Sequence, residues 1–282
     1  MISYVFAILI AMERNNSDSV KARPSATVVL VREGESDPEI LMVRRKAGDA
    51  FGDSYAFPGG VVDDDESQAQ AFCRGTTTEQ ADAALGLPRG GLDFYSAAVR
   101  ELFEETGVLL ARDSQGDWAF SGDQDAESSL RELRGQLDSG VLSWAEILRT
   151  HDLRIACDAL HYFSFWETPL RLPKRWAARF FLAEIPPGQD AQHDGSEITD
   201  SCWMTAAEIL SVGKEAGMKL PFPTLSNLRK ISEFRTIDAL LRWASAQAAE
   251  GIAKIRPVIV QDNGKTRFVI PGDPGYPEGE DQ

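Results

Sequence analysis

The chain contains 282 residues, of which 43% are hydrophobic and 26% charged, and its formal net charge is −15. This composition is ordinary for a globular protein, and the length allows a large core in one elaborated domain or in two small ones. The acidic balance argues against binding along a nucleic acid backbone, which requires a basic surface. The three cysteines, Cys73, Cys157 and Cys202, form no C-x-x-C pair, which indicates reduced thiols rather than a disulfide framework.

The first twelve residues, Met1 to Met12, carry no charged side chain. A membrane-spanning helix needs about 20 apolar residues, so we expect no stable membrane insertion. The segment also lacks a basic n-region and an obvious cleavage site. It is either a weak leader or the product of an upstream start codon with Met12 as the true start, and we favour the second. Residues 1–23 are expected to be a disordered or mis-started terminus.

Apolar and β-branched runs predict the first strands of the chain, and glycines mark the turns between them. A helix is expected to begin with Asp93 as its N-cap and to end at Gly107, a residue suited to the C′ position. The other elements expected in this half are strands at 26–32 and 39–44, a glycine-bearing loop at 51–60 that ends in a short strand, and a strand at 108–111.

The second half of the chain alternates helical and strand patterns. Thr205 and Glu208 form a capping-box signature at the start of a helix, and Asp262-Asn263-Gly264-Lys265 is a strong hairpin signal between two strands at 255–261 and 267–270. The remaining expected elements are helices at 130–137, 143–150 and 223–247, strands at 160–166, 179–185 and 202–204, and a basic turn at 172–175.

The predicted helix that ends at Gly107 contains Arg100-Glu101-Leu102-Phe103-Glu104-Glu105. Three of these carboxylates are spaced i, i+3 and i+4, so they share one helix face. Like charges in this spacing repel one another by a few tenths of a kcal/mol per pair, and a sequence that accepts the repulsion usually has a cation to neutralise it. Clustered carboxylates suit Mg²⁺, which takes oxygen ligands and commonly bridges to phosphates of a substrate. The sequence therefore predicts a metal-dependent enzyme acting on a diphosphate.

These residues resemble the signature of the Nudix hydrolases, G-x5-E-x7-R-E-U-x-E-E-x-G-U, in which U is a bulky aliphatic residue. The second half of the signature matches from Arg100 to Val108, and in the first half Gly60 is followed after five residues by Glu66. The two halves are 26 residues further apart than the signature requires. Either Glu66 is the glutamate of the signature and an insertion follows it, or Asp93 takes part of that role. We favour the insertion, because loops absorb extra length at low entropic cost.

Residues outside the signature resemble the branch of coenzyme A and acyl-coenzyme A diphosphatases. They are Arg44-Arg45, Phe57-Pro58-Gly59-Gly60, Leu172-Pro173-Lys174-Arg175, Arg179-Phe180-Phe181-Leu182 and a Pro-Gly-Asp-Pro segment near the end. The resemblance implies an α+β fold, the α/β/α Nudix sandwich, with a mixed sheet between helices. It implies one domain over 24–282, with insertions at about 67–92 and 124–158 and a helical and hairpin extension from about 222. The coenzyme A motif of this branch has an Arg and a Gly where this chain has Asp49 and Asp53.

The resemblance also implies which residues carry the chemistry. Glu101, Glu104 and Glu105, with a backbone carbonyl of Gly59 or Gly60, would hold Mg²⁺ or Mn²⁺. Arg100 would pair with a glutamate of the cluster, Glu104 at i+4, and orient it. The general base would be Glu101 or Glu197, the latter in a downstream loop. The basic residues expected to bind the phosphates of the substrate are Arg44, Arg45, Lys174, Arg175 and Arg179.

Three functions remain open at this stage. The preferred one is hydrolysis of the diphosphate in coenzyme A or acyl-coenzyme A. The second keeps the chemistry but acts on nucleoside diphosphate sugars or dinucleotides, and the third is a non-catalytic ligand sensor with the Nudix fold. The expected partner is a small-molecule diphosphate and not a nucleic acid, a homodimer is an open alternative to a monomer, and the expected location is cytoplasmic because the sequence ends without a peroxisomal address.

Overall fold

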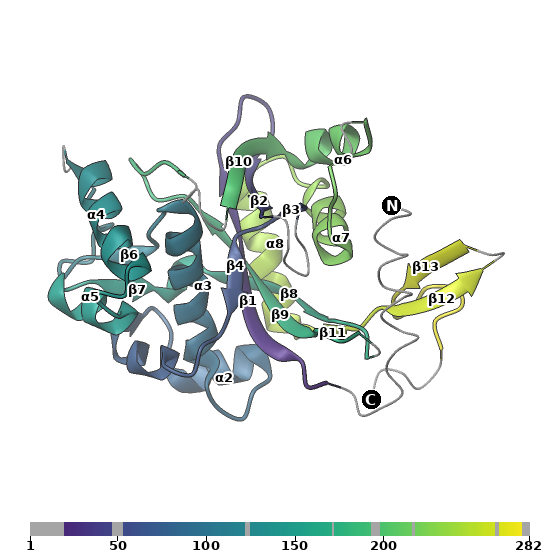
Figure 1. The fold of residues 1–282 in the computed structure, drawn as a ribbon, viewed down its shortest axis with the longest axis horizontal. Helices are drawn as coiled ribbons and strands as arrows, with labels where there is room; N and C mark the ends of the chain where they lie inside the picture. The colour runs from purple at the N-terminus through teal and green to yellow at the C-terminus, as the bar shows by residue number, and fades with distance from the viewer. Residues whose placement is uncertain are drawn as a thin grey trace.

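A mixed β-sheet lies between two layers of helices in the computed structural model of the chain (Figure 1). The structure describes residues 20–46, 53–121, 125–170, 172–192, 198–215, 218–262 and 265–277. Within these ranges the main sheet has the strand order β10-β2-β1-β9-β8-β11, with β3 paired to β2 and β4 paired to β1. Its strands are β1 (Arg23–Arg32), β2 (Glu39–Arg45), β3 (Tyr55–Ala56), β4 (Gly59–Val61), β8 (His161–Glu167), β9 (Trp176–Glu184), β10 (Ile198–Thr205) and β11 (Lys254–Ile255).

The centre of the sheet is the parallel pair β1 and β9, which runs in register from Arg23 opposite Trp176 to Val31 opposite Glu184. Successive side chains of a strand point to opposite faces, and β1 follows this rule with apolar residues on both faces. Val28 and Leu30 belong to one hydrophobic core, whereas Val29 and Val31 belong to the other. Burial on both faces explains why this strand is a nearly continuous apolar run in the sequence.

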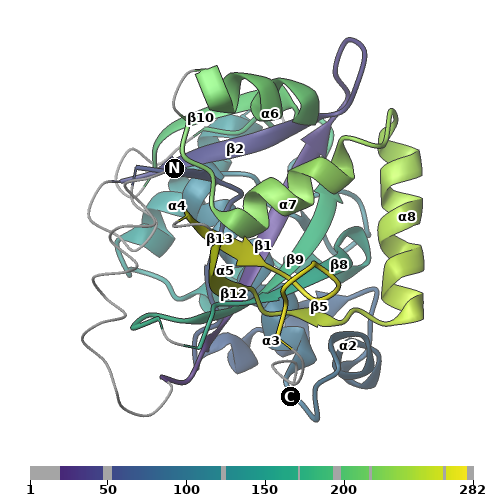
Figure 2. The ribbon, with the colours of Figure 1, turned by 90° about the vertical axis from the view of Figure 1, so that its right-hand side faces the viewer.

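The two cores are covered by different helices. On one face lie α2 (Thr78–Leu85), α3 (Gly91–Thr106), α4 (Ala126–Asp138) and α5 (Trp144–Thr150); on the other lie α6 (Ala206–Glu215), α7 (Phe222–Ile231) and α8 (Ile237–Glu250) (Figures 1 and 2). This arrangement confirms the predicted α+β class with a sheet between helices. None of the helices in the described part of the chain is long and apolar enough to cross a lipid bilayer.

Smaller elements complete the helical layer around α3. The segment after Glu66 forms two short 3₁₀ helices, η1 (Glu66–Gln68) and η2 (Gln70–Phe72), before α2. A three-stranded sheet joins β5 (Cys73–Arg74), β7 (Arg154–Ala156) and β6 (Ala111–Arg112), and η3 (Cys157–Ala159) follows β7. This small sheet therefore ties the two segments that we predicted as insertions to each other. The division of the chain into one domain with insertions stays a prediction.

Several predicted elements are confirmed with small shifts of their ends. The hairpin forms from β12 (Val258–Asp262) and β13 (Lys265–Val269), with Asp262 opposite Lys265. Ser143 caps α5 and forms a reciprocal capping box with Glu146, and the Thr205 and Glu208 pair does the same for α6. The predictions for residues 1–19 lie outside the described residues.

Three predictions were wrong. The expected helix at 223–247 is two helices, because Thr236 accepts a hydrogen bond from the amide of Ala239 and begins α8 anew. The expected strand at 108–111 is mostly extended chain without strand pairing, and only Ala111 enters β6. Asp93 does not cap α3, which begins two residues earlier after Gly90. Its carboxylate instead accepts a hydrogen bond from Gln70 Nε2 at 2.7 Å.

Candidate active site

The candidate site is built on α3, which carries the glutamates of the predicted metal site. The helix ends at Gly107, whose φ of 73° is a left-handed conformation that glycine adopts without steric cost. The apolar face of α3, including Leu102 and Phe103, is buried against the sheet. This packing leaves Glu101 and Glu105 beside β4, the strand that contains the last two residues of the Phe-Pro-Gly-Gly run, whereas Glu104 contacts Arg100.

Arg100 contacts three glutamates of the site at once. Its Nε donates to Glu66 Oε1 at 2.6 Å, its Nη1 donates to Glu104 Oε2 at 2.9 Å, and its Nη2 lies 3.0 Å from Glu101 Oε1. Nη2 also donates to the carbonyl of Val61 and to Asp63. Burial lowers the pKa of Arg100, but the carboxylates of Glu101, Glu66 and Glu104 more than offset this effect, so the net pKa is raised. Part of the positive charge that offsets the repulsion between the clustered carboxylates therefore comes from Arg100, an arginine of the same helix.

Glu66, which the insertion hypothesis takes as the glutamate of the signature, lies beside Arg100. Its side chain is buried and contacts Arg100, although 34 residues separate the two in the sequence. Ser96 Oγ donates to the other oxygen of Glu66, and Trp144 Nε1 donates to Ser96 Oγ at 3.0 Å. Burial raises the pKa of Glu66. The alternative, Asp93, contacts Gln70 at the other end of α3 and does not contact Arg100.

Glu105 faces the glycine-containing strand. Its Oε2 accepts a hydrogen bond from the amide of Gly59 at 2.9 Å, and its Oε1 lies 3.1 Å from Arg45 Nη2. Arg45 also donates to the carbonyl of Gly59. One of the predicted substrate-binding arginines therefore lies directly at the acidic cluster.

The backbone of Gly60 lies close to Glu101. A Cβ atom added at Gly60 would be 2.3 Å from the carboxyl carbon of Glu101, so any side chain at this position would force that carboxylate to move. This close approach brings backbone and carboxylate oxygens into one small region, which suits a hard divalent ion. No group of three His, Cys, Asp or Glu side chains among the described residues is already arranged around a metal position. The donor chemistry fits Mg²⁺ or Mn²⁺, while in this structure the arginines hold the carboxylates.

Burial also sets the proton affinity of the cluster. It raises the pKa of Glu101, and it raises the pKa of Glu104 from the ordinary value of 4.5 to about 7. Arg100 opposes this shift at both residues. Carboxyl groups with a raised pKa are suited to exchanging protons near neutral pH.

The other predicted basic residues are spread over the molecule. Arg44 is exposed and pairs with Asp53 at 2.6 Å, and Lys174 is exposed on the turn before β9. Arg175 is buried and bonded to Glu167 at 2.5 Å. Arg179 is buried between the rings of Phe94 and Phe165. Because burial leaves no surface for a phosphate at Arg175 and Arg179, we reassign these two as structural residues.

Glu197, the second candidate for the general base, lies outside the described residues. Three supporting residues were not predicted: Ser96, which lies on α3 itself, and Trp144 and Arg134, which reach α3 from α5 and α4. The contact of Asp63 with Arg100 was also not predicted, although the sequence contains one signal for it: Asp63 begins an acidic run three residues after Gly60.

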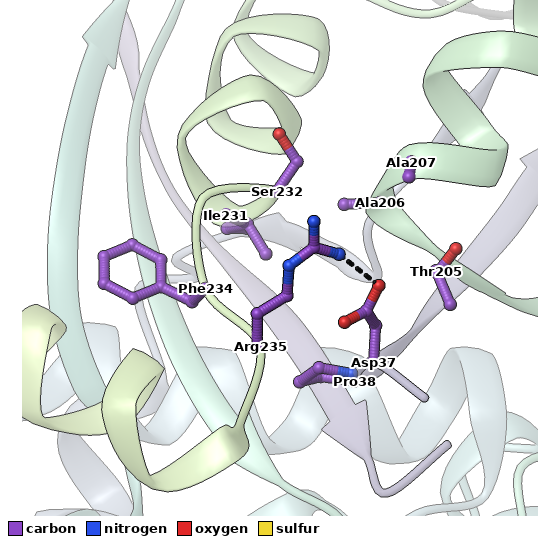
Figure 3. Close-up of a pocket in the computed structure, with 9 residues that line it drawn as sticks. All are labelled: Asp37, Pro38, Thr205, Ala206, Ala207, Ile231, Ser232, Phe234 and Arg235. Atoms are coloured by element: carbon purple, nitrogen blue, oxygen red, sulfur yellow. Dashed lines mark hydrogen bonds and ion pairs between the residues drawn. The ribbon is translucent and has the colours of Figure 1, made fainter. Parts of the chain in front are cut away.

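A small cavity lies on the other side of the sheet, near the start of α6 (Figure 3). Asp37, Thr205, Phe234 and Arg235 are among the residues that line it, and Arg235 Nη1 is 2.5 Å from Asp37 Oδ2. It has room for about one water molecule. None of the residues of the acidic cluster on α3 or of the Phe-Pro-Gly-Gly run lines it, so it is separate from the candidate active site.

A sheet between helical layers, with the two halves of the signature joined by Arg100, defines a Nudix hydrolase. The chain belongs to the family described as the NUDT19 Nudix domain, whose model matches residues 65–231, more than half of its length. The fold is similar to that of a NUDIX hydrolase from Alicyclobacillus acidocaldarius, with a TM-score of 0.63 and 24% identity over 79% of this chain and 96% of that chain.

Two curated relatives carry the name acyl-coenzyme A diphosphatase NUDT19. The protein of Xenopus laevis is 24% identical, over 87% of this chain and 73% of its own length. The protein of Homo sapiens is 28% identical, over 73% of this chain and 56% of its own length, so the chain spans little more than half of the human relative.

Proposed function

We propose that this chain is a metal-dependent diphosphohydrolase that cleaves the diphosphate linkage of coenzyme A or acyl-coenzyme A. The substrate class is supported by the names of its relatives in frog and human. The observation that carries the chemistry is the contact of Arg100 with Glu66, Glu101 and Glu104, which unites the separated halves of the signature. A non-catalytic sensor would not need this set of charged contacts at one helix face.

Glu101, Glu104 and Glu105, with a carbonyl of Gly59 or Gly60, would hold the Mg²⁺ or Mn²⁺. The bound ion would neutralise charge on the phosphate oxygens and polarise the phosphorus for attack. Arg100 keeps Glu104 in place through a bond of 2.9 Å. Arg45 keeps Glu105 in place and adds a positive charge beside it.

The reaction is the attack of a water oxygen on one phosphorus, with cleavage of the bond from that phosphorus to the bridging oxygen. The water proton passes to a carboxylate, and two phosphate monoesters are formed. Glu101 is one candidate for this base, because burial raises its pKa toward the range in which a carboxylate accepts a proton efficiently. Glu197 is the second candidate.

Arg44, Arg45 and Lys174 would contact the phosphates of the substrate. Arg44 and Lys219 both pair with Asp53, the residue that stands where the coenzyme A motif has glycine. The φ of Asp53 is 58°, a left-handed conformation that glycine adopts easily and aspartate tolerates better than most residues. The backbone conformation at this position is therefore compatible with the motif although its residue differs.

The test is incubation of the protein and Mg²⁺ with a panel of acyl-coenzyme A, ADP-ribose, nucleotide sugars and dinucleotides, followed by identification of the products by mass. We expect adenosine 3′,5′-bisphosphate from the coenzyme A substrates. Failure on these alone would favour nucleotide sugars or dinucleotides, and failure on the whole panel would favour a sensor. Glu104→Gln should lower turnover by about two to four orders of magnitude and leave the fold intact.

A further inference from the structure

The last carbonyl groups of any α-helix have no hydrogen-bond partner within the helix, and this holds for the carboxyl-terminal end of α3. The carbonyl of Phe103 accepts from the amide of Gly107 at 2.8 Å, and that of Thr106 accepts from the amide of Gln192 at 2.8 Å. The carbonyl of Glu104 lies between them in sequence. It accepts its hydrogen bonds from a side chain of a different helix, Arg134 on α4.

Arg134 joins two segments that flank the active site. Its Nε and Nη2 both donate to the carbonyl of Glu104, the former at 2.7 Å, and its Nη1 donates to the carbonyl of Gln192 at 2.7 Å. The side chain is only 9% exposed, so water cannot easily replace these bonds. A planar guanidinium presents its donors in a fixed fork and reaches the two carbonyls from different nitrogens, whereas a lysine has all its donors on one nitrogen.

The segment that Arg134 holds is itself fastened to the end of α3. The side chain of Gln189 accepts from the amide of Leu109 at 2.8 Å and donates to its carbonyl at 3.1 Å. Gln192 also donates through its backbone amide to Thr106. Arg134 thus completes a closed set of contacts around the last turn of α3, the turn that bears Glu104 and Glu105.

Charge adds to this geometry. The carbonyl end of a helix carries a partial negative charge, and cations there are favourable. On α3 the same end carries Glu104 and Glu105, so a buried guanidinium at the Glu104 carbonyl opposes both sources of negative potential. Because the carbonyl and side chain of Glu104 belong to one residue, fixing the first limits the movement of the second.

We propose that Arg134 is a positioning residue that sets the location of Glu104 for binding of the divalent ion. This inference rests on the proposed function of the site. A displacement of about 1 Å at a catalytic group can reduce turnover by about 100-fold, so the loss of Arg134 should act on turnover and on metal affinity more than on the KM of the substrate.

The experiment compares Arg134→Met and Arg134→Lys with the wild type and with Arg131→Met. Arg131 lies on the same helix and pairs with Glu127 of that helix, with its own side chain 65% exposed, so it is the matched control. Two quantities are measured on each protein: kcat and KM for acyl-coenzyme A with saturating Mg²⁺, and the Kd of Mn²⁺ by isothermal titration calorimetry without substrate. Circular dichroism establishes that each variant is folded at the assay temperature.

We expect Arg134→Met to lower kcat by about 30-fold and raise the Kd of Mn²⁺ by about 10-fold, with KM changed by less than about 3-fold. Arg134→Lys keeps the charge but lacks the planar fork of donors, so it should fall between Arg134→Met and the wild type, and Arg131→Met should match the wild type. If Arg134→Met does not fold, Arg134→Lys decides by the same two measurements.

A folded Arg134 variant with wild-type kcat and wild-type Mn²⁺ affinity would overturn the positioning role. A wild-type protein that binds Mn²⁺ but cleaves no diphosphate would instead overturn the proposed function, and the calorimetric comparison would still decide the role of Arg134. A wild-type protein that binds no Mn²⁺ would overturn both.

Discussion

Trp144 of α5 donates a hydrogen bond from Nε1 to Ser96 Oγ on α3 at 3.0 Å, and both side chains are buried. Ser96 in turn donates to Glu66, which holds Arg100. A residue of the segment predicted as the second insertion is thus connected through three bonds to the centre of the acidic cluster. Because Arg134 contacts the carboxyl-terminal end of α3, this segment makes hydrogen bonds to α3 at two separate points.

The first prediction concerns this connection. Ser96→Ala leaves a buried oxygen of Glu66 without the hydroxyl donor, so the free energy of unfolding should fall by about 1–3 kcal/mol. Trp144→Phe removes the donor to Ser96 but keeps an aromatic ring beside Phe103, so its cost should be nearer about 1 kcal/mol. Urea denaturation of both variants measures these values. Equal losses in the two would contradict the view that Glu66 depends on Ser96.

The second prediction concerns the close approach of Gly60 to Glu101. Gly60→Ala forces the Glu101 carboxylate to move, because the new Cβ would lie 2.3 Å from it. The carboxylate is the far end of a flexible chain, so we expect little loss of stability but a fall in kcat of about 100-fold. Gly135→Ala is the control, since a Cβ there meets nothing within 4 Å. It should keep full activity and gain about 0.5–1 kcal/mol in stability, as alanine favours a helix interior.

The third prediction is a pH dependence of stability in the metal-free protein. A carboxyl group whose pKa is raised by folding binds its proton more tightly in the folded chain, so its contribution is complete below the unfolded pKa and is lost as pH rises through the folded value. For Glu104 this window runs from 4.5 to about 7, and the raised pKa values of Glu101 and Glu66 act in the same direction. Tm should therefore fall across this range.

Glu104→Gln should reduce the steepness of that fall, because the amide does not titrate. Saturating Mg²⁺ should also reduce it, since a cation favours the ionised carboxylates. The measurement is Tm by calorimetry at half-unit steps of pH, with and without Mg²⁺. A metal-free wild type whose Tm is constant from pH 4.5 to about 7 would contradict the raised pKa of Glu104.

The fourth prediction separates a structural from a substrate-binding role for Arg179. Its guanidinium lies 4.4 Å from the centre of the Phe94 ring and 4.3 Å from that of Phe165, and its Nη2 donates to the carbonyl of Leu85 at 3.0 Å. No carboxylate in the described ranges forms an ion pair with it, and burial lowers its pKa. Arg179→Met keeps the packing and removes a buried charge, so stability should change by no more than about 2 kcal/mol.

The same variant should leave KM for acyl-coenzyme A within about 2-fold of the wild type, because the side chain contacts no surface that a phosphate could reach. Steady-state kinetics on the folded variant provide the measurement. A rise of KM by about 10-fold or more would restore Arg179 to the substrate-binding set.

Local signals in the sequence were sufficient for much of this fold. The apolar run of β1, the capping box of α6 and the glycine after α3 each act within a few residues, and each of these signals was found where it was predicted. Where a local signal had a competitor, the prediction was wrong. The apolar pattern continues from α7 into α8, but Thr236 caps a new helix between them, so periodicity alone merged the two.

The acidic cluster was predicted because its residues lie within five positions on one helix, whereas the contacts that support it were not predicted. Arg134 and Trp144 reach α3 from elements that begin some 20 to 40 residues after it ends. Nothing in their own neighbourhood distinguishes them from an ordinary surface arginine or core tryptophan. The burial of Arg175 and Arg179 was not predicted either, because a basic run beside a strand does not reveal whether its side chains are buried.

The central pairing of the sheet has a consequence for how the protein is made. β1 lies beside β9, but residues 33–175 must be synthesised before β9 begins to appear. At a translation rate of about 5–20 residues per second, roughly 7–30 s pass between the emergence of the two strands. Throughout that interval one edge of an apolar strand has no partner, a state that invites association with other chains. The first strand of the nascent chain is therefore open to such association until Trp176–Glu184 has been synthesised.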